Sequence, residues 1–312
     1  MTRKLFSLLI SSFALLLLMG AGVEPDAAVL VDEDKEQTAD TAVSVEQPEP
    51  VPAVAGESLM NFVESLDYSL TVDGQPVTTD VAKTYRNETT YVALAPMSKC
   101  LDADSGYWWD SGTQTMTITS DKLTLTATVG QLYLTANGRY LYTPEGIQIE
   151  NNKVIVPLSA LTEAFGATLT WNGATGVTSV TRGSGALTSG DQYYNSDDLF
   201  WLSRVIYTES GNQPLEGMMA VGNVILNRVK HPAFPDTIEG VLAQKNQFTT
   251  YQSGRIANST PNERSVIAAK LVLDGGVVEE TKNALYFDSS PNSWAARNRA
   301  CVAVIGGHRF YA

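Results

Sequence analysis

One carboxyl group, that of Glu209, lies where a helix of this sequence would present it to a buried site. Apolar residues recur at helical spacing over 196–210, with Leu202, Val205 and Ile206 on one face. Glu209 falls on the same face in the last predicted turn, where desolvation and the negative end of the helix dipole both disfavour an ionised carboxyl. A carboxylic acid that keeps its proton near neutral pH is what general-acid cleavage of a glycosidic bond requires.

The residues that flank this helix predict its ends. Ser196 has the side chain of an N-cap, and Gly211 is suited to a left-handed stop. A glutamate near a helix end is commonly a solvated surface residue. The helical pattern alone leaves that alternative open.

No other carboxylate of the C-terminal part is placed as clearly as Glu209. A second helix is predicted from about 214 to 230, and its Glu216 lies on a polar stripe opposite the apolar face. Asp236 has the context of a helix cap and Asp288 that of a strand end. Two-carboxylate glycosidases need a facing pair roughly 5 to 9.5 Å apart. The sequence therefore predicts one acid rather than a pair.

The remaining C-terminal elements are expected to form an α+β domain with a small antiparallel sheet. The sequence predicts a short helix capped by Asp236 or Thr237, a loop at 247–251, a helix opened by the capping box 260–263, a strand at 284–288, and a hairpin of strands 301–305 and 308–311.

Composition divides the 312 residues into five segments. A basic start, an apolar run and small residues predict a secretory signal peptide at 1–22. Acidic residues and prolines predict a disordered linker at 23–57. Alternating strands predict a β-rich domain at 58–182, and a Gly/Ser linker at 183–195 precedes the last domain at 196–312. We therefore expect an exported protein, secreted or associated with the cell wall, without a spanning segment after signal cleavage.

Charge and residue usage exclude several classes of function. The formal charge of −13 comes mainly from the 23–57 linker, because eleven acidic and eleven basic side chains balance from residue 196 onward. Nucleic acid is therefore not an expected partner. The sequence holds two histidines, His231 and His308, and no zinc motif, so neither a metal nor another cofactor is expected.

The β-rich domain contains an internal repeat. Residues 91–103, followed by Trp109, match residues 155–167, followed by Trp171. Each copy is expected to form a strand, a short helix and a strand with the tryptophan. A sugar-stacking surface of Trp108, Trp109 and Trp171 is one interpretation, and core packing is the favoured role for at least Trp171. This repeat resembles the copper amine oxidase N-terminal-like domain, a stalk module; the region has no histidine, so the resemblance implies no copper.

The last domain resembles the SleB-type spore cortex-lytic cell wall hydrolase family. The resemblance is carried by ordered motifs across the domain, at 206–210, 220–229, 234–238, 247–248, 284–287, 293–294 and 305–310. It implies a compact lysozyme-like domain that acts on peptidoglycan glycan strands in cell wall organisation or spore germination. The glutamate of the family's Tyr-x-Glu motif is its catalytic acid, which is Glu209 here.

The resemblance also implies a mechanism, that of a lytic transglycosylase. Glu209 alone would act as acid and then as base, while the 6-hydroxyl of N-acetylmuramic acid attacks its own C1 and forms a 1,6-anhydro end. Six side chains are expected to contact the glycan: Tyr207, Asn227, Phe248, Tyr251, Tyr286 and Trp294. Core packing is the alternative for Tyr207 and Tyr286, and holding Glu209 or satisfying backbone groups is the alternative for Asn227.

Three other interpretations stay open at this point. A hydrolytic muramidase would give a reducing end, a non-catalytic wall-binding protein would release nothing, and a zinc amidase would be inhibited by a chelator. The sequence does not distinguish spore cortex from vegetative wall, and it leaves the oligomeric state open.

Overall fold

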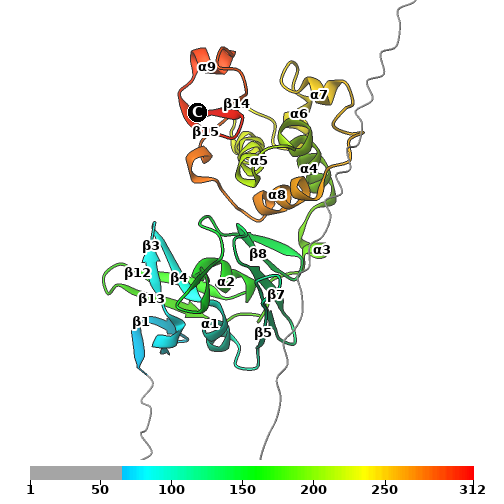
Figure 1. Ribbon diagram of the computed structural model, residues 1–312. Helices are drawn as coiled ribbons and strands as arrows, with labels where there is room; N and C mark the ends of the chain where they lie inside the picture. Colours follow the sequence, from blue (N-terminus) through cyan, green and yellow to red (C-terminus); the bar gives the residue numbers. More distant parts are fainter. Residues whose placement is uncertain (1–64) are drawn as a thin grey trace, which may run out of the picture. The chain divides into compact units, whose positions relative to one another are not determined.

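The computed structural model describes residues 65–312 (Figure 1). The predicted signal peptide at 1–22, the predicted linker at 23–57 and residues 58–64 of the β-rich domain lie outside the described residues. Within residues 65–312, no helix combines the length and the apolar character that crossing a bilayer needs.

The β-rich part, called the stalk module here (residues 65–182), contains three sheets. In strands such as 115–119 and 124–128, threonine alternates with apolar residues, because the strand buries one face and turns the other toward solvent. The first sheet has the order β12-β13-β1-β2, with β1 (Leu66–Val72), β2 (Gln75–Thr78), β12 (Thr168–Asn172) and β13 (Val177–Thr181). The second has the order β10-β11-β4-β3, with β3 (Thr84–Arg86), β4 (Thr89–Ala93), β10 (Gln148–Glu150) and β11 (Lys153–Pro157). The third is a meander of β5 (Gly106–Asp110), β6 (Thr115–Thr119), β7 (Thr124–Thr128), β8 (Tyr133–Ala136) and β9 (Arg139–Tyr142).

The predicted repeat is confirmed as two strand–helix–strand units, β4-α1-β5 and β11-α2-β12. Helix α1 (Leu94–Leu101) and helix α2 (Leu158–Ala164) follow the two central strands, which pair antiparallel with Val92 opposite Val156. The predicted apolar faces of both helices are buried in one core, namely Leu94, Met97 and Leu101 in the first copy and Leu158, Leu161 and Phe165 in the second.

The two tryptophans of the repeat differ in their surroundings. Trp109 on β5 is half-buried and packs against the core, whereas Trp171 on β12 is 66% exposed. The prediction of core packing for Trp171 is therefore wrong. Both β5 and β12 are edge strands of their sheets, so the difference comes from what packs against each ring.

The C-terminal module (residues 196–312) combines helices with a three-stranded antiparallel sheet of order β14-β16-β15, as the predicted α+β class requires. Its elements are α4 (Ser196–Ser210), α5 (Leu215–Lys230), α6 (Ile238–Ala243), α7 (Thr249–Gln252), α8 (Glu263–Leu273), the 3-10 turn η2 (Glu279–Thr281), β14 (Tyr286–Asp288), α9 (Trp294–Asn298), β15 (Cys301–Ile305) and β16 (His308–Tyr311). Figure 1 shows α9 beside β14 and β15 at the C-terminal end of the chain.

Several predicted helix ends differ from the structure. Asn195, rather than Ser196, caps α4 by accepting hydrogen bonds from two backbone N–H groups of the first turn. Gly211 is right-handed, with φ −60°, so it is no left-handed stop. A Cβ at that position would lie 2.6 Å from the carbonyl oxygen of Tyr207, so close approach explains the glycine. Asn262, and not Thr260, caps α8. The predicted loop at 247–251 contains α7.

Helix α5 is the centre of the C-terminal module. Residues 217–225 of α5 are all buried, and α4, α6 and α8 pack against this helix. Small side chains permit this contact: a Cβ on Gly222 would lie 3.0 Å from the Cδ1 of Ile206.

The predicted polar stripe of α5 anchors the chain that follows α8. Asn223 Nδ2 donates to the carbonyl oxygen of Gly276 at 2.9 Å, and Asn223 Oδ1 accepts from the N–H of Val278 at 3.0 Å. Asn223 is 4% exposed, so water cannot replace these bonds in the folded state. Glu216 accepts a hydrogen bond from the Tyr142 hydroxyl at 3.2 Å. The stripe is therefore used for structure.

We expect Asn223→Ala to lower the free energy of unfolding by about 2 kcal/mol, because two buried backbone groups lose their partners. Chemical denaturation of the full chain measures this change. Asn258→Ala is the matched control: Asn258 is exposed, and its loss should change stability by less than about 0.5 kcal/mol. Equal stabilities of the two variants would contradict the anchoring role.

Residues 183–195, predicted as a Gly/Ser linker, make specific contacts. The N–H of Leu187 donates to the carbonyl oxygen of Ala164 at 3.0 Å, and the N–H of Gly190 donates to that of Asn137 at 2.9 Å. The short helix α3 (Gly190–Tyr193) follows. Much of this segment is thus held against the stalk module, which its glycine and serine content did not indicate.

Candidate active site

A cavity of about 620 Å³ opens in the C-terminal module beside the end of α4. It collects side chains from six separate stretches of the sequence. They are Glu209 of α4, Arg228 of α5, the segment Asn246–Phe248, the segment Tyr286–Ser289, Trp294 and Ala295 of α9, and His308 of β16. The small sheet and α9 thus supply most of the wall that faces Glu209.

Glu209 lies at the boundary between the core and this cavity. The apolar face of α4 is fully buried at Leu202, Val205 and Ile206, and Glu209 follows on the same side in the last turn, half-buried. The hydroxyl Oγ1 of Thr250 donates to Glu209 Oε1 at 2.7 Å. One carboxyl oxygen is therefore held by α7, and the group lines the cavity.

Arg228 connects two segments that line the cavity, the one that contains Gln247 and the one that begins after Leu285. It is 4% exposed; its Nε donates to the carbonyl oxygen of Leu285 at 2.7 Å and its Nη1 donates to Gln247 Oε1 at 3.3 Å. Its guanidinium lies 5.6 Å from the ring centroid of Phe248 and 5.4 Å from that of Tyr286. Burial lowers the pKa of Arg228 to about 10, so the side chain stays cationic at neutral pH.

His308 faces Glu209 from the sheet. The side chain is 9% exposed, and its ring lies 5.6 Å from that of Phe287 in an edge-on arrangement. Its Nδ1 is buried without a hydrogen-bond partner in the described part of the chain. Burial lowers the pKa of His308, while the nearby carboxylates of Glu209 and Asp288 act in the opposite direction.

This lowered pKa predicts a pH-dependent stability. The ordinary value for histidine is 6.5, and below it the unfolded chain binds a proton more readily than the folded chain. The contribution of His308 is therefore fully present above about pH 6.5 and is lost as the pH falls toward the folded-state pKa. We expect His308→Phe to weaken the decline in unfolding free energy between about pH 7 and pH 5, measured by urea titration.

The other histidine provides the control for this prediction. His231 is exposed, and His231→Gln should keep the wild-type decline. An identical pH dependence in His308→Phe and the wild type would exclude His308 as its source.

Aromatic side chains form the outer part of the cavity. The rings of Tyr286 and Trp294 lie 5.6 Å apart, and the guanidinium of Arg299 lies 5.3 Å from the first and 5.5 Å from the second. Trp294 is 54% exposed, whereas Phe248 is 5% exposed and packs mainly in the core. Trp294 and Tyr286 thus offer ring surface to a ligand, and Phe248 shapes the floor.

Three of the side chains predicted to contact a ligand do not line this cavity. Tyr207 is 37% exposed on the surface beside it. Asn227 Nδ2 donates to the carbonyl oxygens of Thr281 and Ala284, so this side chain holds backbone. The Tyr251 hydroxyl donates to Glu239 at 3.0 Å, and its ring packs 5.4 Å from that of Trp201. Contact of these three side chains with a glycan stays a prediction.

Four residues at the cavity of Glu209 were not among the predicted site residues. Arg228 carried a signal, since a cation on an otherwise apolar helix face needs a reason to be buried. Asp288 was assigned to a strand end and His308 to a hairpin, and both line the cavity. Thr250 was placed in a loop, where nothing in the sequence connects it with Glu209.

Two family models match separate parts of the chain. Residues 71–180 match the Copper amine oxidase N-terminal domain, and residues 212–311 match the Cell Wall Hydrolase family. The C-terminal module is a cell wall hydrolase domain. The residues that match the family begin at 212, so this match does not include Glu209. That Glu209 lines the cavity is shown by the structure alone.

Proteins similar to the hydrolase domain come from spore-forming bacteria. The "Spore cortex-lytic enzyme" of Bacillus cereus is 37% identical over 121 residues, which is 38% of this chain and 45% of the relative. The crystal structure of the catalytic domain of the Bacillus cereus SleB protein is 34% identical, covering 38% of this chain and 92% of that one, with a TM-score of 0.35. The catalytic domain of the germination-specific lytic transglycosylase SleB from Bacillus anthracis is 35% identical, covering 38% and 97%, with a TM-score of 0.34. The chain spans less than half the length of this curated relative.

Proposed function

We propose that this protein is a secreted or wall-associated enzyme that degrades peptidoglycan by cleaving the bond between N-acetylmuramic acid and N-acetylglucosamine. The observation that carries the proposal is the carboxyl of Glu209 on the wall of a 620 Å³ cavity, held by Thr250 and faced by aromatic rings. Membership of the C-terminal module in the hydrolase family and its similarity to spore cortex-lytic enzymes support this substrate.

The first step is protonation of the leaving group. Glu209 donates its proton to the glycosidic oxygen, the bond from that oxygen to C1 of the muramic acid breaks, and N-acetylglucosamine leaves with a new hydroxyl. Glu209 is then a carboxylate. The hydroxyl of Thr250 stabilises this charge, because it donates to Oε1. General-acid assistance of this kind contributes roughly 10²- to 10⁴-fold to a rate.

The second step closes a ring within the sugar. The 6-hydroxyl of the muramic acid attacks C1 while the Glu209 carboxylate takes its proton, which gives a 1,6-anhydro end and restores the acid. No water is consumed. An intramolecular nucleophile has a high effective concentration, so the reaction needs no second carboxylate. In this proposal Tyr286 and Trp294 stack on sugar rings, and Arg228 keeps the walls of the cavity at their spacing.

Hydrolysis is the second candidate, and one observation favours it. Asp288 lines the same cavity as Glu209, and its Oδ1 accepts a 2.6 Å hydrogen bond from the N–H of Ser290. A second carboxylate that is fixed in this way and lines the same cavity is a candidate general base for water. A muramidase with Glu209 as acid and Asp288 as base would leave a reducing muramic acid end.

Product analysis of Asp288→Asn distinguishes the two candidates. For a lytic transglycosylase we expect less than about a tenfold loss of rate, because Asp288 transfers no proton. Mass spectrometry of digests should then show 1,6-anhydro ends, one water lighter than reducing ends. A loss of about 10²-fold or more, with reducing ends from the wild type, would support hydrolysis instead. Parallel digests of spore cortex and vegetative wall would identify the preferred substrate.

A further inference from the structure

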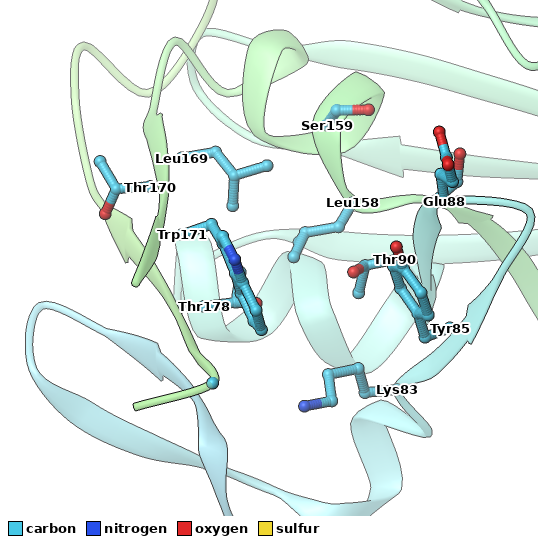
Figure 2. Close-up of a pocket in the computed structure, with 12 residues that line it drawn as sticks. Lys83, Tyr85, Glu88, Thr90, Leu158, Ser159, Leu169, Thr170, Trp171 and Thr178 are labelled. Carbon is cyan, nitrogen blue, oxygen red and sulfur yellow. The ribbon is translucent and has the colours of Figure 1, made fainter. Parts of the chain in front are cut away.

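The stalk module has a cavity of its own, with a volume of about 560 Å³. It lies between the sheet that ends in β12 and the sheet that ends in β3, with the first turn of α2 at its base (Figure 2). Figure 2 shows Trp171 and Tyr85 on opposite sides of this space, with Leu158 between them. We call it the stalk cavity.

The two rings of the stalk cavity are largely exposed. Trp171 is 66% exposed and Tyr85 is 71% exposed, whereas Leu158 at the base is fully buried. The ring on each side provides a flat face for the C–H surface of a pyranose, and Leu169 of the lining, 36% exposed, offers an apolar contact for the methyl of an acetamido group. The geometry therefore fits an N-acetylated sugar.

The repeat gives an independent reason to assign a role to Trp171. Its counterpart Trp109 packs against the core of the stalk module, so the tryptophan of the first copy has a packing role. In the second copy the ring points away from that core and lines the stalk cavity. The turn after β12 runs beside it, since a Cβ on Gly173 would lie 3.6 Å from Trp171 Nε1. Packing explains Trp109 and leaves Trp171 without a structural role.

The charges around the stalk cavity favour a ligand without a large net charge. Lys83 is the basic side chain of its lining, and the Lys83 Nζ already lies 3.6 Å from Asp67 Oδ2. Glu88, at the tip of the β3–β4 turn, adds a negative charge. A polyanion such as teichoic acid would find no unpaired positive charge in this lining. Hydroxyl and amide groups of a glycan can bond to Lys83, Glu88 and the threonines of the lining.

We propose that the stalk cavity binds a peptidoglycan glycan strand by stacking its N-acetylated sugars on Trp171 and Tyr85. The proposal deepens the function proposed above and rests on it, because the C-terminal module is taken to cut the same polymer. The stalk cavity then holds the chain on insoluble wall while bonds are cleaved at Glu209. Attachment at a second site raises the effective concentration of substrate at the first.

The test measures retention of the full chain on purified wall. All proteins carry Glu209→Gln, and co-sedimentation with insoluble peptidoglycan gives the apparent dissociation constant. We expect the added pair Tyr85→Ala and Trp171→Ala to weaken binding about tenfold, since two stacking contacts together contribute roughly what a factor of ten requires. Trp108→Ala is the matched control, because Trp108 is 63% exposed on β5 and lies outside the stalk cavity.

A second measurement separates this proposal from the proposed function. In chains with an intact Glu209, the paired substitution should slow lysis of insoluble wall and leave cleavage of short soluble glycan fragments unchanged. Glu209→Gln should do the reverse, abolishing turnover while wall binding stays normal. Trp171→Phe and Tyr85→Phe keep a ring at each site and should restore binding, which excludes misfolding as the cause of the loss.

Three results would overturn the proposal. Unchanged retention of the alanine pair would show that the stalk cavity does not bind wall. An equal loss in Trp108→Ala would show unspecific adhesion of exposed aromatic residues. Retention that disappears when the peptide stems are removed from the glycan would make the stem peptide the ligand.

Discussion

Glu209→Gln is expected to lower the rate of wall lysis by about a thousandfold, the largest effect of any single substitution considered for this protein. Glutamine has nearly the same shape and can still accept the hydrogen bond from Thr250, so the fold and the cavity should persist. It has no proton to give to a glycosidic oxygen and no carboxylate to take one back. Turbidity loss of purified wall, together with circular dichroism of the variant, measures both expectations.

Glu216→Gln is the matched control for this substitution. Both glutamates lie on the packed helices α4 and α5, but Glu216 bonds to the Tyr142 hydroxyl and does not line the cavity. Its substitution should leave the rate within about threefold of wild type. Full lysis by Glu209→Gln would refute the proposed mechanism, and a lack of lysis by the wild type on every wall tested would favour a non-catalytic wall-binding protein.

Arg228→Ala is expected to have the second largest effect, because it acts on both stability and activity. The substitution removes charge-assisted hydrogen bonds to Leu285 and Gln247 and leaves a void between three aromatic rings. We expect the free energy of unfolding to fall by about 2–4 kcal/mol. The segments that carry Gln247 and Tyr286 would no longer be joined, so the activity of the protein that remains folded should fall about a hundredfold.

The test separates the two contributions of Arg228. Denaturant titration gives the stability, and wall lysis is measured under conditions in which the variant is folded. Arg264→Ala serves as the control, because Arg264 is exposed on α8 and its loss should change neither quantity appreciably. Arg228→Lys keeps the charge but not the planar fork, and should regain only part of the activity. Wild-type activity in folded Arg228→Ala would show that the bridge is dispensable.

Local patterns in the sequence were enough to predict the β-rich repeat, the α+β class of the last domain and the existence of α4 and α5. These features depend on the periodic spacing of apolar residues along the chain. Leu158, Leu161 and Phe165, for example, fall on one face of a helix whatever packs against that face. Helix ends were predicted less well, because several residues near each end can act as caps. Asn195 and Asn262 took that role from Ser196 and Thr260.

The surroundings of Glu209 required the tertiary structure. Thr250 is 41 residues from Glu209 in the sequence and makes a direct hydrogen bond to it, and no local signal connects the two. Arg228, Asp288 and His308 meet Glu209 only because β14 and β16 pair beside α5. The side chains of Asn227 and Tyr251 are of types that can bind a sugar. In the structure the Asn227 amide donates to a backbone carbonyl, and the Tyr251 ring packs against a neighbouring ring.

The sequence by itself determined that α4 and α5 form and that Glu209 lies on the buried side of α4, because helical periodicity acts over a few residues. The tertiary structure decided which side chains surround that carboxyl, and it placed Trp171 in a cavity rather than in a core. The physical reason is that burial and hydrogen-bond partners are properties of contacts between distant segments. Equivalent positions of the repeat, such as Trp109 and Trp171, therefore have different surroundings, because different segments pack beside them.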